Sequence, residues 1–187
     1  MRESKAVHLQ EWQILKSQTV YDYPPFLKLV KQTVEISDGH IVDDYHSLEM
    51  PDYCLVIAFC GEQEIITLRG YRHGLKEVTT FLPGGLIHED ESPLSAARRE
   101  LVEESGYQAE KWTSIGTYIP NSNYGCGRVH LFQAIDAKKT HDPVTDDLEN
   151  MVVEVIDLAT IRKWVRENQI LSLSSVAAIA LAMAEVF

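Results

Sequence analysis

The sequence has few cysteines and few basic side chains, and both shortages narrow the class of protein. Its 187 residues include three cysteines, Cys54, Cys60 and Cys126. Their number is odd and no Cys-x-x-Cys pair occurs, which favours buried free thiols in a reducing cytoplasm over a disulfide framework. Lys and Arg number 17 against 28 Asp and Glu, for a net charge of −11. A general nucleic-acid-binding protein needs a basic surface, and this composition gives no sign of one.

The sequence also lacks a long apolar segment. Its most apolar stretch, residues 176–187, is too short and too closely flanked by serines to span a bilayer. The polar opening MRESKAVHLQEW has no signal-peptide core. We therefore expect a cytoplasmic protein that has neither a membrane nor a nucleic acid as partner.

The remaining composition is that of a globular protein, with 45% apolar and 24% charged residues. Apolar runs between turn signals predict a β-rich segment over residues 1–50 and a mixed α/β (α+β) domain over 51–187. The run from Tyr53 to Cys60 is apolar throughout, as in a strand buried on both faces. Strands are expected at about 12–17, 26–36, 41–49, 53–60, 65–69, 78–82, 112–118, 129–134 and 151–156, and helices at about 93–105, 158–168 and 174–185.

The helix that begins after Ser92 carries the most informative pattern. Ser92 is a good N-cap, Pro93 suits the first helical position, and Gly106 is a natural C′ residue. At 100° per residue, three glutamates fall within an arc of about 100° on this helix; they are Glu100, Glu103 and Glu104. Like charges this close repel unless cations neutralise them, and Mg²⁺ prefers such oxygen ligands. The alternative is a solvated acidic face that forms salt bridges with Arg98 and Arg99.

Residues 85–107 read GLIHEDESPLSAARRELVEESGY, with a fixed spacing of glycine, glutamate and arginine. The segment resembles the Nudix box, G-x5-E-x7-R-E-U-x-E-E-x-G-U, where U is a bulky apolar residue. The matching residues are Gly85, Glu91, Arg99, Glu100, Leu101, Glu103, Glu104 and Gly106. Only Tyr107 departs, because an aliphatic residue is commoner there. The resemblance implies a Nudix α/β/α sandwich with a mixed sheet, preceded by a small N-terminal antiparallel sheet.

The resemblance also implies a metal-dependent pyrophosphohydrolase. Glu100, Glu103 and Glu104 would bind Mg²⁺, with Mn²⁺ as the alternative, and Gly84 would contribute its backbone carbonyl. Arg99 is expected to be a structural partner, of Glu91 in particular. The segments around Trp12, Arg69–Arg72 and Leu82–Gly85 are similar to the ADP-ribose pyrophosphatase branch, whose N-terminal sheet helps to form a homodimer. A homodimer is therefore expected here, with a monomer as the alternative.

Within this branch, further roles are implied for individual residues. Trp12 and Tyr45 are candidates to stack on the nucleobase, and Arg72 suits bidentate contacts to a diphosphate. Arg128 lies in a loop suited to a terminal sugar or phosphate, although the sequence leaves its orientation open. Glu149 is expected to act as the catalytic base together with the metal-binding Glu103 and Glu104, and Glu154 is its competitor.

Two departures from the sequence pattern of this branch leave the identity of the substrate undecided. Phe81 stands where glutamate is common before the Leu-Pro turn, and His88 stands where another glutamate is common in the box. ADP-ribose, cleaved to AMP and ribose 5-phosphate, is the expected substrate. Another nucleotide sugar such as GDP-mannose, a dinucleotide or a nucleoside triphosphate is the alternative within enzymes. A non-catalytic Nudix-fold nucleotide sensor is the alternative outside them, but such domains tend to lose box glutamates, which are all present here.

Overall fold

The computed structural model describes residues 11–144 and 150–184 of the chain. Within these ranges the chain divides into two units, one formed by Met1–Pro51 and Asn121–Gly127 and the other by Asp52–Pro120 and Arg128–Phe187. No described helix combines the length and apolarity that a membrane span requires. The three cysteines are free thiols, but only Cys54 is buried as expected; Cys60 and Cys126 are partly exposed.

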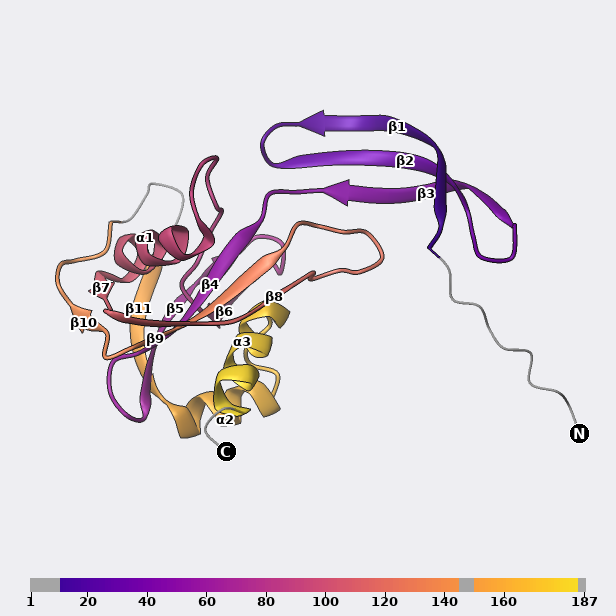
Figure 1. The fold of residues 1–187 in the computed structure, drawn as a ribbon. Helices are drawn as coiled ribbons and strands as arrows, with labels where there is room; N and C mark the ends of the chain where they lie inside the picture. The colour runs from indigo at the N-terminus through magenta and orange to yellow at the C-terminus, as the bar shows by residue number, and fades with distance from the viewer. Residues whose placement is uncertain (1–10, 145–149, 185–187) are drawn as a thin grey trace, which may run out of the picture. The chain divides into compact units, whose positions relative to one another are not determined.

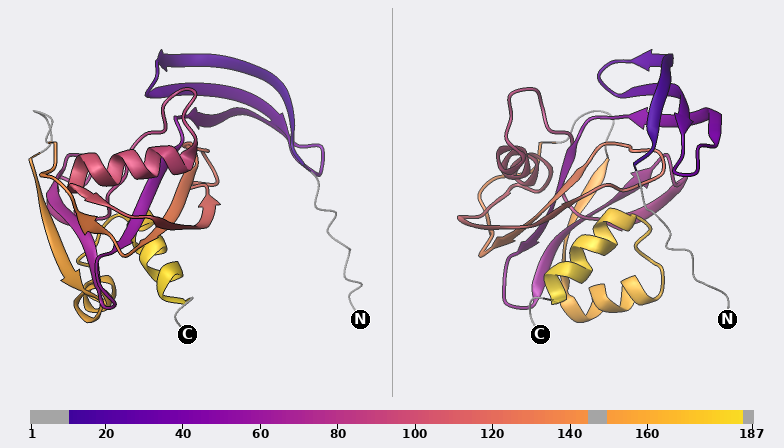
Figure 2. Two further views of the ribbon diagram at one scale, coloured as in Figure 1. Left: turned by 60° about the vertical axis from the view of Figure 1, so that its left-hand side comes forward. Right: turned by 45° about the vertical axis from the view of Figure 1, so that its right-hand side comes forward.

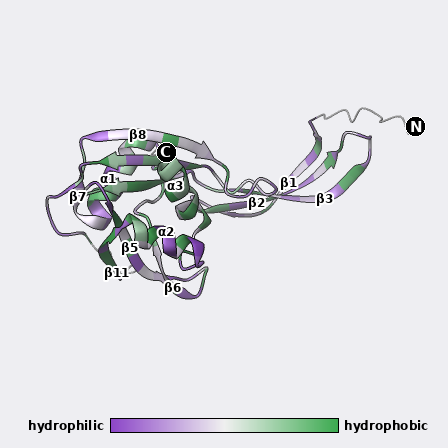
Figure 3. Cartoon of the chain, turned by 90° about the horizontal axis from the view of Figure 1, so that it is seen from below, coloured by the Kyte–Doolittle hydropathy of each residue, from purple (hydrophilic) through white to green (hydrophobic). Residues whose placement is uncertain are grey.

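The first unit is a three-stranded antiparallel sheet in the order β1-β2-β3, where β1 is Gln13–Tyr23, β2 is Leu27–Glu35 and β3 is Ile41–Glu49. The segment Asn121–Gly127 is attached to β3 by backbone hydrogen bonds in which Leu48 N donates to Tyr124 O (2.6 Å) and Cys126 N donates to Leu48 O (3.2 Å). Only two apolar side chains of this sheet are fully buried, Val30 and Val34. Hydrophobic stretches are visible along its strands in Figure 3.

The second unit is built on a mixed six-stranded sheet in the order β11-β5-β4-β9-β8, with β6 paired to β5. Strands β4 and β9 are parallel, and the other neighbours are antiparallel. The short strands β7 and β10 form a separate two-stranded pair. The strands are β4 (Tyr53–Phe59), β5 (Glu64–Arg72), β6 (Glu77–Phe81), β7 (Tyr107–Gln108), β8 (Lys111–Tyr118), β9 (Val129–Ile135), β10 (Lys138–Lys139) and β11 (Met151–Asp157).

Helices cover both faces of this sheet. Helix α1 (Pro93–Ser105) lies on one face, and α2 (Leu158–Arg166) and α3 (Leu173–Ala184) lie on the other (Figures 1 and 2). Strand β4 is buried on both sides because alternate residues pack into two different cores. Its Leu55, Ile57 and Phe59 face α2 and α3, whereas Cys54, Val56 and Ala58 face α1. The apolar run therefore forms the predicted central strand.

Helix α1 has the ends that its sequence predicts. The Ser92 side chain accepts a hydrogen bond from Ser95 N (3.2 Å), and Gly106 closes the helix with φ of 75° while its N–H donates to Val102 O (2.8 Å). Ala96, Ala97 and Leu101 are fully buried against the sheet. This burial fixes the rotation of the helix and leaves its acidic edge at the rim of the core.

Gly106 offers a test of how α1 ends. A Cβ at this position would lie 2.1 Å from His141 O, and the positive φ disfavours any other residue. We expect Gly106→Ala to lower the free energy of unfolding by about 1–3 kcal/mol in urea denaturation. Gly74→Ala is the matched control, because a Cβ there meets nothing within 4 Å. Equal stability of the two variants would contradict this account of the helix end.

Candidate active site on helix α1

Three glutamates on the last turns of α1 lie beside a glycine turn that follows β6. The side chain of Glu100 is 12% exposed and that of Glu103 is 47% exposed. Glu104 Oε2 accepts a hydrogen bond from Gly84 N at 2.7 Å. The spacing predicted from the sequence therefore brings the carboxylates to one edge of the helix, next to Gly84.

The glycine turn is held tightly against β4. Val56 N donates to Pro83 O and Cys54 N donates to Gly85 O, each at 2.9 Å. The carbonyl of Gly84, between them, accepts no hydrogen bond from any described residue. A Cβ on Gly84 would lie 2.1 Å from Cys54 O, and a Cβ on Gly85 would lie 2.4 Å from Glu100 Oε1. Only glycines allow the strand and the Glu100 carboxylate to approach this closely.

Arg99 neutralises the acidic edge. Its Nε and one terminal nitrogen donate to the two oxygens of Glu91, at 3.0 and 2.9 Å. The other terminal nitrogen donates to Glu100 Oε1 (2.7 Å) and to Glu103 Oε2 (3.1 Å). A further bond to Leu86 O, at 3.0 Å, ties the guanidinium to the loop before the helix. The expected pairing of Arg99 with Glu91 is thus confirmed, and Arg99 also reaches two of the predicted metal ligands.

Burial and the positive charge of Arg99 shift the pKa values of these carboxyl groups in opposite directions. Burial raises the pKa of the Glu100 carboxyl, while the hydrogen bond from Arg99 acts to lower it. The pKa of Glu91 is lowered, chiefly by its hydrogen bonds from Arg99. Burial also raises the pKa of the neighbouring Cys54 thiol to about 11, so this cysteine stays neutral beneath the turn. The positive charge of Arg99 therefore offsets part of the cost of burying the Glu100 carboxylate.

The donor set fits a hard divalent cation, since it offers three carboxylates and a carbonyl that accepts no other bond. Among the described residues, however, no three His, Cys, Asp or Glu side chains converge on a common point. Arg99 accounts for this, because it binds Glu100 and Glu103, while Glu104 is turned to Gly84 N. A bound metal would therefore have to take the place of Arg99 at these two carboxylates.

A cavity of about 520 Å³ adjoins the same glycine turn. It is lined by Gly84, by Arg72 at the end of β5, by His73 after it, and by residues that precede and begin α3. The guanidinium carbon of Arg72 lies 3.7 Å from the centre of the Phe81 ring, a cation–π contact. Phe81 is only 5% exposed. Phe81, which stands where the family resemblance led us to expect glutamate, is thus a buried ring in contact with Arg72.

Comparison with known proteins decides the family. Residues 51–184 match the NUDIX domain. The chain belongs to the Nudix family. It is 26% identical to a methanol dehydrogenase activator of Bacillus methanolicus over 155 residues, which span 82% of this chain and 83% of the relative. It is 28% identical to an ADP-ribose pyrophosphatase of Bacillus subtilis over 132 residues, 71% of this chain and 70% of the relative.

A solved structure described as an ADP compounds hydrolase matches with a TM-score of 0.83 and 22% identity over 97% of each chain. This likeness confirms the Nudix fold predicted from the sequence. The protein is a Nudix pyrophosphohydrolase, and Nudix hydrolases generally use divalent metal ions. The acidic edge of α1 is thus the Nudix box of this chain.

The remaining predicted residues have different surroundings. Trp12 and Tyr45 both belong to the first unit, where their rings meet edge to face at 5.7 Å and the Tyr45 hydroxyl donates to Asn123 O. Arg128 is held through its backbone, whose N–H donates to Asp52 Oδ1 (2.7 Å), and its side chain makes no hydrogen bond or ion pair to a described residue. Glu149, the expected base, lies outside the described residues.

Glu154, the competitor of Glu149, lies on the far face of the sheet from α1. Its neighbour Val153 packs into the core beneath α1, whereas Ile156 packs into the core beneath α2 and α3. Because side chains alternate along a strand, Glu154 faces the same side as Ile156. Its Oε2 atom is buried there without a hydrogen-bond partner. This orientation turns the Glu154 carboxylate away from the glutamates of α1.

Sequence reasoning did not identify several residues that line the cavity. Tyr53, whose hydroxyl is 2.7 Å from Ser174 Oγ, and the segment Leu171–Leu173 come from distant parts of the chain. Apolar patterns mark them only as parts of a strand and of a helix start. Nothing local to them indicates a shared cavity.

The role of Arg99 can be tested by its removal. Arg99→Gln leaves Glu91, Glu100 and Glu103 without their common cation, and we expect it to lower the free energy of unfolding by about 2 kcal/mol in the presence of a chelator. Arg98→Gln is the control, because Arg98 is exposed on the same helix and lies over the ring of Trp112. A loss of less than about 0.5 kcal/mol for Arg99→Gln, the level of an ordinary surface change, would refute this role.

Proposed function

We propose that this Nudix hydrolase cleaves the diphosphate bond of ADP-ribose to give AMP and ribose 5-phosphate, with Mg²⁺ as the metal and Mn²⁺ as the alternative. The position of Gly84 carries the proposal. Its N–H binds Glu104 on the acidic edge, and the same residue lines the cavity that contains Arg72. Cation ligands and a phosphate-binding guanidinium therefore meet at one turn. The ADP-ribose pyrophosphatase of Bacillus subtilis, a relative over most of this chain, supports this substrate.

In this proposal Glu100, Glu103, Glu104 and the carbonyl of Gly84 hold the metal. The metal would neutralise the negative charge that develops on the diphosphate oxygens. Arg72 binds the diphosphate through its planar guanidinium, with Phe81 fixing its position. Glu149 accepts a proton from the attacking water, whose oxygen bonds to one phosphorus. The bond from that phosphorus to the bridging oxygen breaks, and the leaving phosphomonoester keeps the bridging oxygen and the electron pair.

The other predicted contacts concern the two ends of the substrate. Trp12 and Tyr45 are proposed to stack on the nucleobase, and Arg128 is proposed to bind the distal sugar or phosphate. Trp12 is half exposed and the Arg128 side chain has no partner among the described residues, so both side chains are available for such contacts. The reduced state of the three cysteines agrees with a cytoplasmic location for the enzyme.

A different nucleotide sugar, such as GDP-mannose, is the second candidate. Phe81 favours it, because an uncharged ring replaces the carboxylate that is common in the ADP-ribose branch. The loss of a hydrogen-bonding group at a buried position changes which sugar or base can be recognised, whereas the cleavage chemistry at α1 is unaffected.

Homodimerisation is part of the proposal. The first unit is a single sheet, and its described part contains no helix to cover it. Many of its large apolar side chains are about half exposed, including Ile14, Val20 and Tyr23. An isolated three-stranded sheet gains stability when an apolar face is covered, and a second copy of the chain is the occupant that the family resemblance indicates.

Hydrolysis is tested with a substrate panel of ADP-ribose, ADP-glucose, GDP-mannose, NADH, diadenosine polyphosphates and nucleoside triphosphates, measured by phosphate release with Mg²⁺ and a coupled phosphatase. We expect the highest kcat/KM for ADP-ribose.

Glu104→Gln should lower kcat by about 100-fold or more, while Glu110→Gln, at an exposed position outside the box, should leave it unchanged. A kcat for Glu104→Gln within a few-fold of wild type would contradict the metal role, and preference for GDP-mannose would select the second candidate.

The dimer is tested by sedimentation velocity. We expect a species of twice the 21.2 kDa chain mass. Val20→Glu should weaken association by about tenfold or more, because it removes apolar burial worth roughly 1.5 kcal/mol. Gln18→Glu adds the same charge to an exposed position of the same strand and should have a smaller effect. A wild-type protein that sediments as a monomer at micromolar concentration would refute the proposal of a dimer.

A further inference from the structure

The cavity beside Gly84 contains hydroxyl groups to which the proposed hydrolysis gives no role. Tyr53 comes from the start of β4, and Ser172 comes from the connection that precedes α3. Both line the same space of about 520 Å³ as Arg72, the residue proposed to bind the diphosphate. One end of a substrate held there by its diphosphate would therefore lie among these hydroxyls.

The Tyr53 hydroxyl is held in a fixed position. It lies 2.7 Å from Ser174 Oγ in the first turn of α3, and the Tyr53 ring packs against the core beneath α2 and α3. Burial raises the pKa of Tyr53 above its ordinary value, so the hydroxyl keeps its proton. A hydroxyl has one donor and two acceptor positions, and a single bond to Ser174 leaves positions for a ligand.

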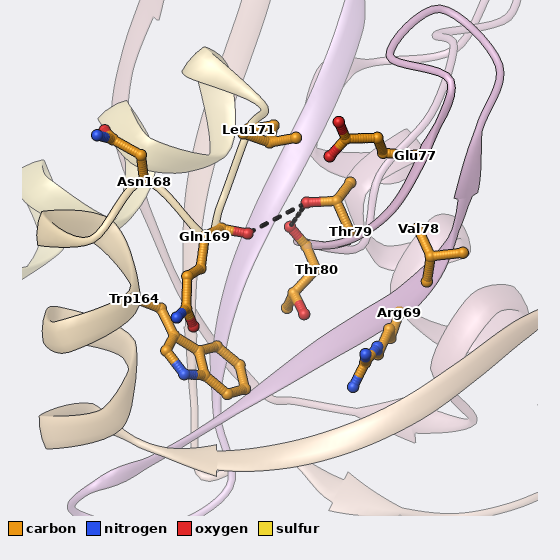
Figure 4. A pocket seen from close by; sticks show the side chains of 9 residues that line it. All are labelled: Arg69, Glu77, Val78, Thr79, Thr80, Trp164, Asn168, Gln169 and Leu171. Carbon is orange, nitrogen blue, oxygen red and sulfur yellow. Dashed lines mark hydrogen bonds between the residues drawn. The ribbon is translucent and has the colours of Figure 1, made fainter.

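The wall of the cavity that precedes α3 is fixed by hydrogen bonds of two buried residues. The Thr79 hydroxyl donates to Gln169 O at 3.4 Å, a bond that Figure 4 shows between β6 and the connection from α2 to α3. Ser175 Oγ accepts from Leu82 N at 3.3 Å, and Ser175 N donates to Ser172 Oγ at 3.4 Å. The Ser172 side chain is thus held in place before any ligand arrives.

The lining suits a sugar better than a nucleobase. The Phe81 ring is covered by the Arg72 guanidinium at 3.7 Å, and the Tyr53 ring packs against the core, so both rings already have contacts within the protein. The third ring, His73, meets Tyr71 edge to face at 6.2 Å. The remaining apolar side chains of the lining are leucines. A sugar has aliphatic C–H groups on its ring faces and hydroxyls at its edges, and the leucines and hydroxyls of the lining match both.

We propose that this cavity binds the distal sugar of the substrate, which in ADP-ribose is the ribose of the ribose 5-phosphate half, and that Tyr53 determines specificity for the hydroxyls of that sugar. The inference rests on the proposed function. Ser174 is a positioning residue that orients the Tyr53 hydroxyl, and Ser172 offers a second hydroxyl. Arg128, proposed for the same end of the substrate, is a backbone neighbour of Tyr53, whose N–H donates to Arg128 O at 2.9 Å.

Product binding tests the sugar site without any hydrolysis. In isothermal titration calorimetry of the full-length protein with Mg²⁺, we expect ribose 5-phosphate to bind. Tyr53→Phe should weaken this binding about fivefold, the usual effect of one neutral hydrogen bond. AMP binding should stay unchanged, because AMP is the other half of the substrate. Tyr118→Phe is the matched control, since it removes the hydroxyl of an exposed tyrosine that does not line the cavity.

Kinetics test whether Tyr53 recognises the hydroxyls of the sugar. The comparison substrate is ADP esterified with tetrahydrofurfuryl alcohol, which has the ring of ribose without its hydroxyls. Tyr53→Phe should lower kcat/KM for ADP-ribose about fivefold, mainly through KM, and should leave kcat/KM for the analogue unchanged. The preference for ADP-ribose then falls by the same factor. A purely structural role of Tyr53 would lower both values equally.

Ser174→Ala tests the positioning role. It should weaken ribose 5-phosphate binding in the same direction as Tyr53→Phe. The double variant should bind no more weakly than Tyr53→Phe alone, because Ser174 acts only through the Tyr53 hydroxyl. Additive losses would refute the positioning role.

Two results would overturn the sugar site. One is ribose 5-phosphate binding that is absent in the wild type or equally strong in Tyr53→Phe. The other is loss of AMP binding in Tyr53→Phe with ribose 5-phosphate binding retained, which would place the nucleoside in this cavity. A protein that binds ribose 5-phosphate through Tyr53 but does not hydrolyse ADP-ribose would refute the proposed substrate and support the sugar site.

Discussion

The contact between Arg99 and three carboxylates is the constraint on which the site depends. Glu91, Glu100 and Glu103 all bind this one guanidinium, and Glu100 is almost withdrawn from solvent. A buried carboxylate without a cation costs several kcal/mol, so the acidic edge of α1 is stable only with a positive partner in place. The arginine and glutamates of the Nudix box therefore form one electrostatic unit. A divalent ion held by Glu100 and Glu103 would have to take the place of Arg99 there, and Arg99 would keep its hydrogen bonds to Glu91 and to the Leu86 carbonyl.

The glycine turn fixes the position of these carboxylates relative to the sheet. Gly84 and Gly85 lie against β4 on one side and against Glu104 and Glu100 on the other, with no room for a Cβ. The central strand thus fixes the turn, and the turn fixes the height of the carboxylates above the sheet. Because Gly84 also lines the cavity of Arg72, the same close packing sets the separation between the glutamates of α1 and the Arg72 guanidinium. Backbone geometry, rather than any single side chain, aligns the two halves of the site.

The sequence predicted those elements whose conformation depends on residues within the same segment. Ser92, Pro93 and Gly106 mark the ends of α1, and the apolar run 53–60 marks the central strand, since capping and burial on both faces leave a direct trace in the sequence. Long-range pairing leaves a weaker trace. Strand β1 extends to Tyr23, beyond the expected end near residue 17, because its pairing with β2 continues to Leu27. The two-residue strands β7 and β10 were not expected at all. The cavity beside the glycine turn brings Tyr53 together with the segment Leu171–Leu173, so no local pattern could reveal it.

Phe81, which stands where the family resemblance led us to expect glutamate, shows how an arginine can be ordered without a carboxylate beside it. A carboxylate at this position would hold Arg72 by an ion pair and would also repel the phosphates that Arg72 is suited to bind. The buried Phe81 ring holds the guanidinium at 3.7 Å through its face instead. The substitution therefore retains an ordered arginine with one negative charge fewer beside it, in a protein whose net charge of −11 otherwise opposes the approach of a diphosphate.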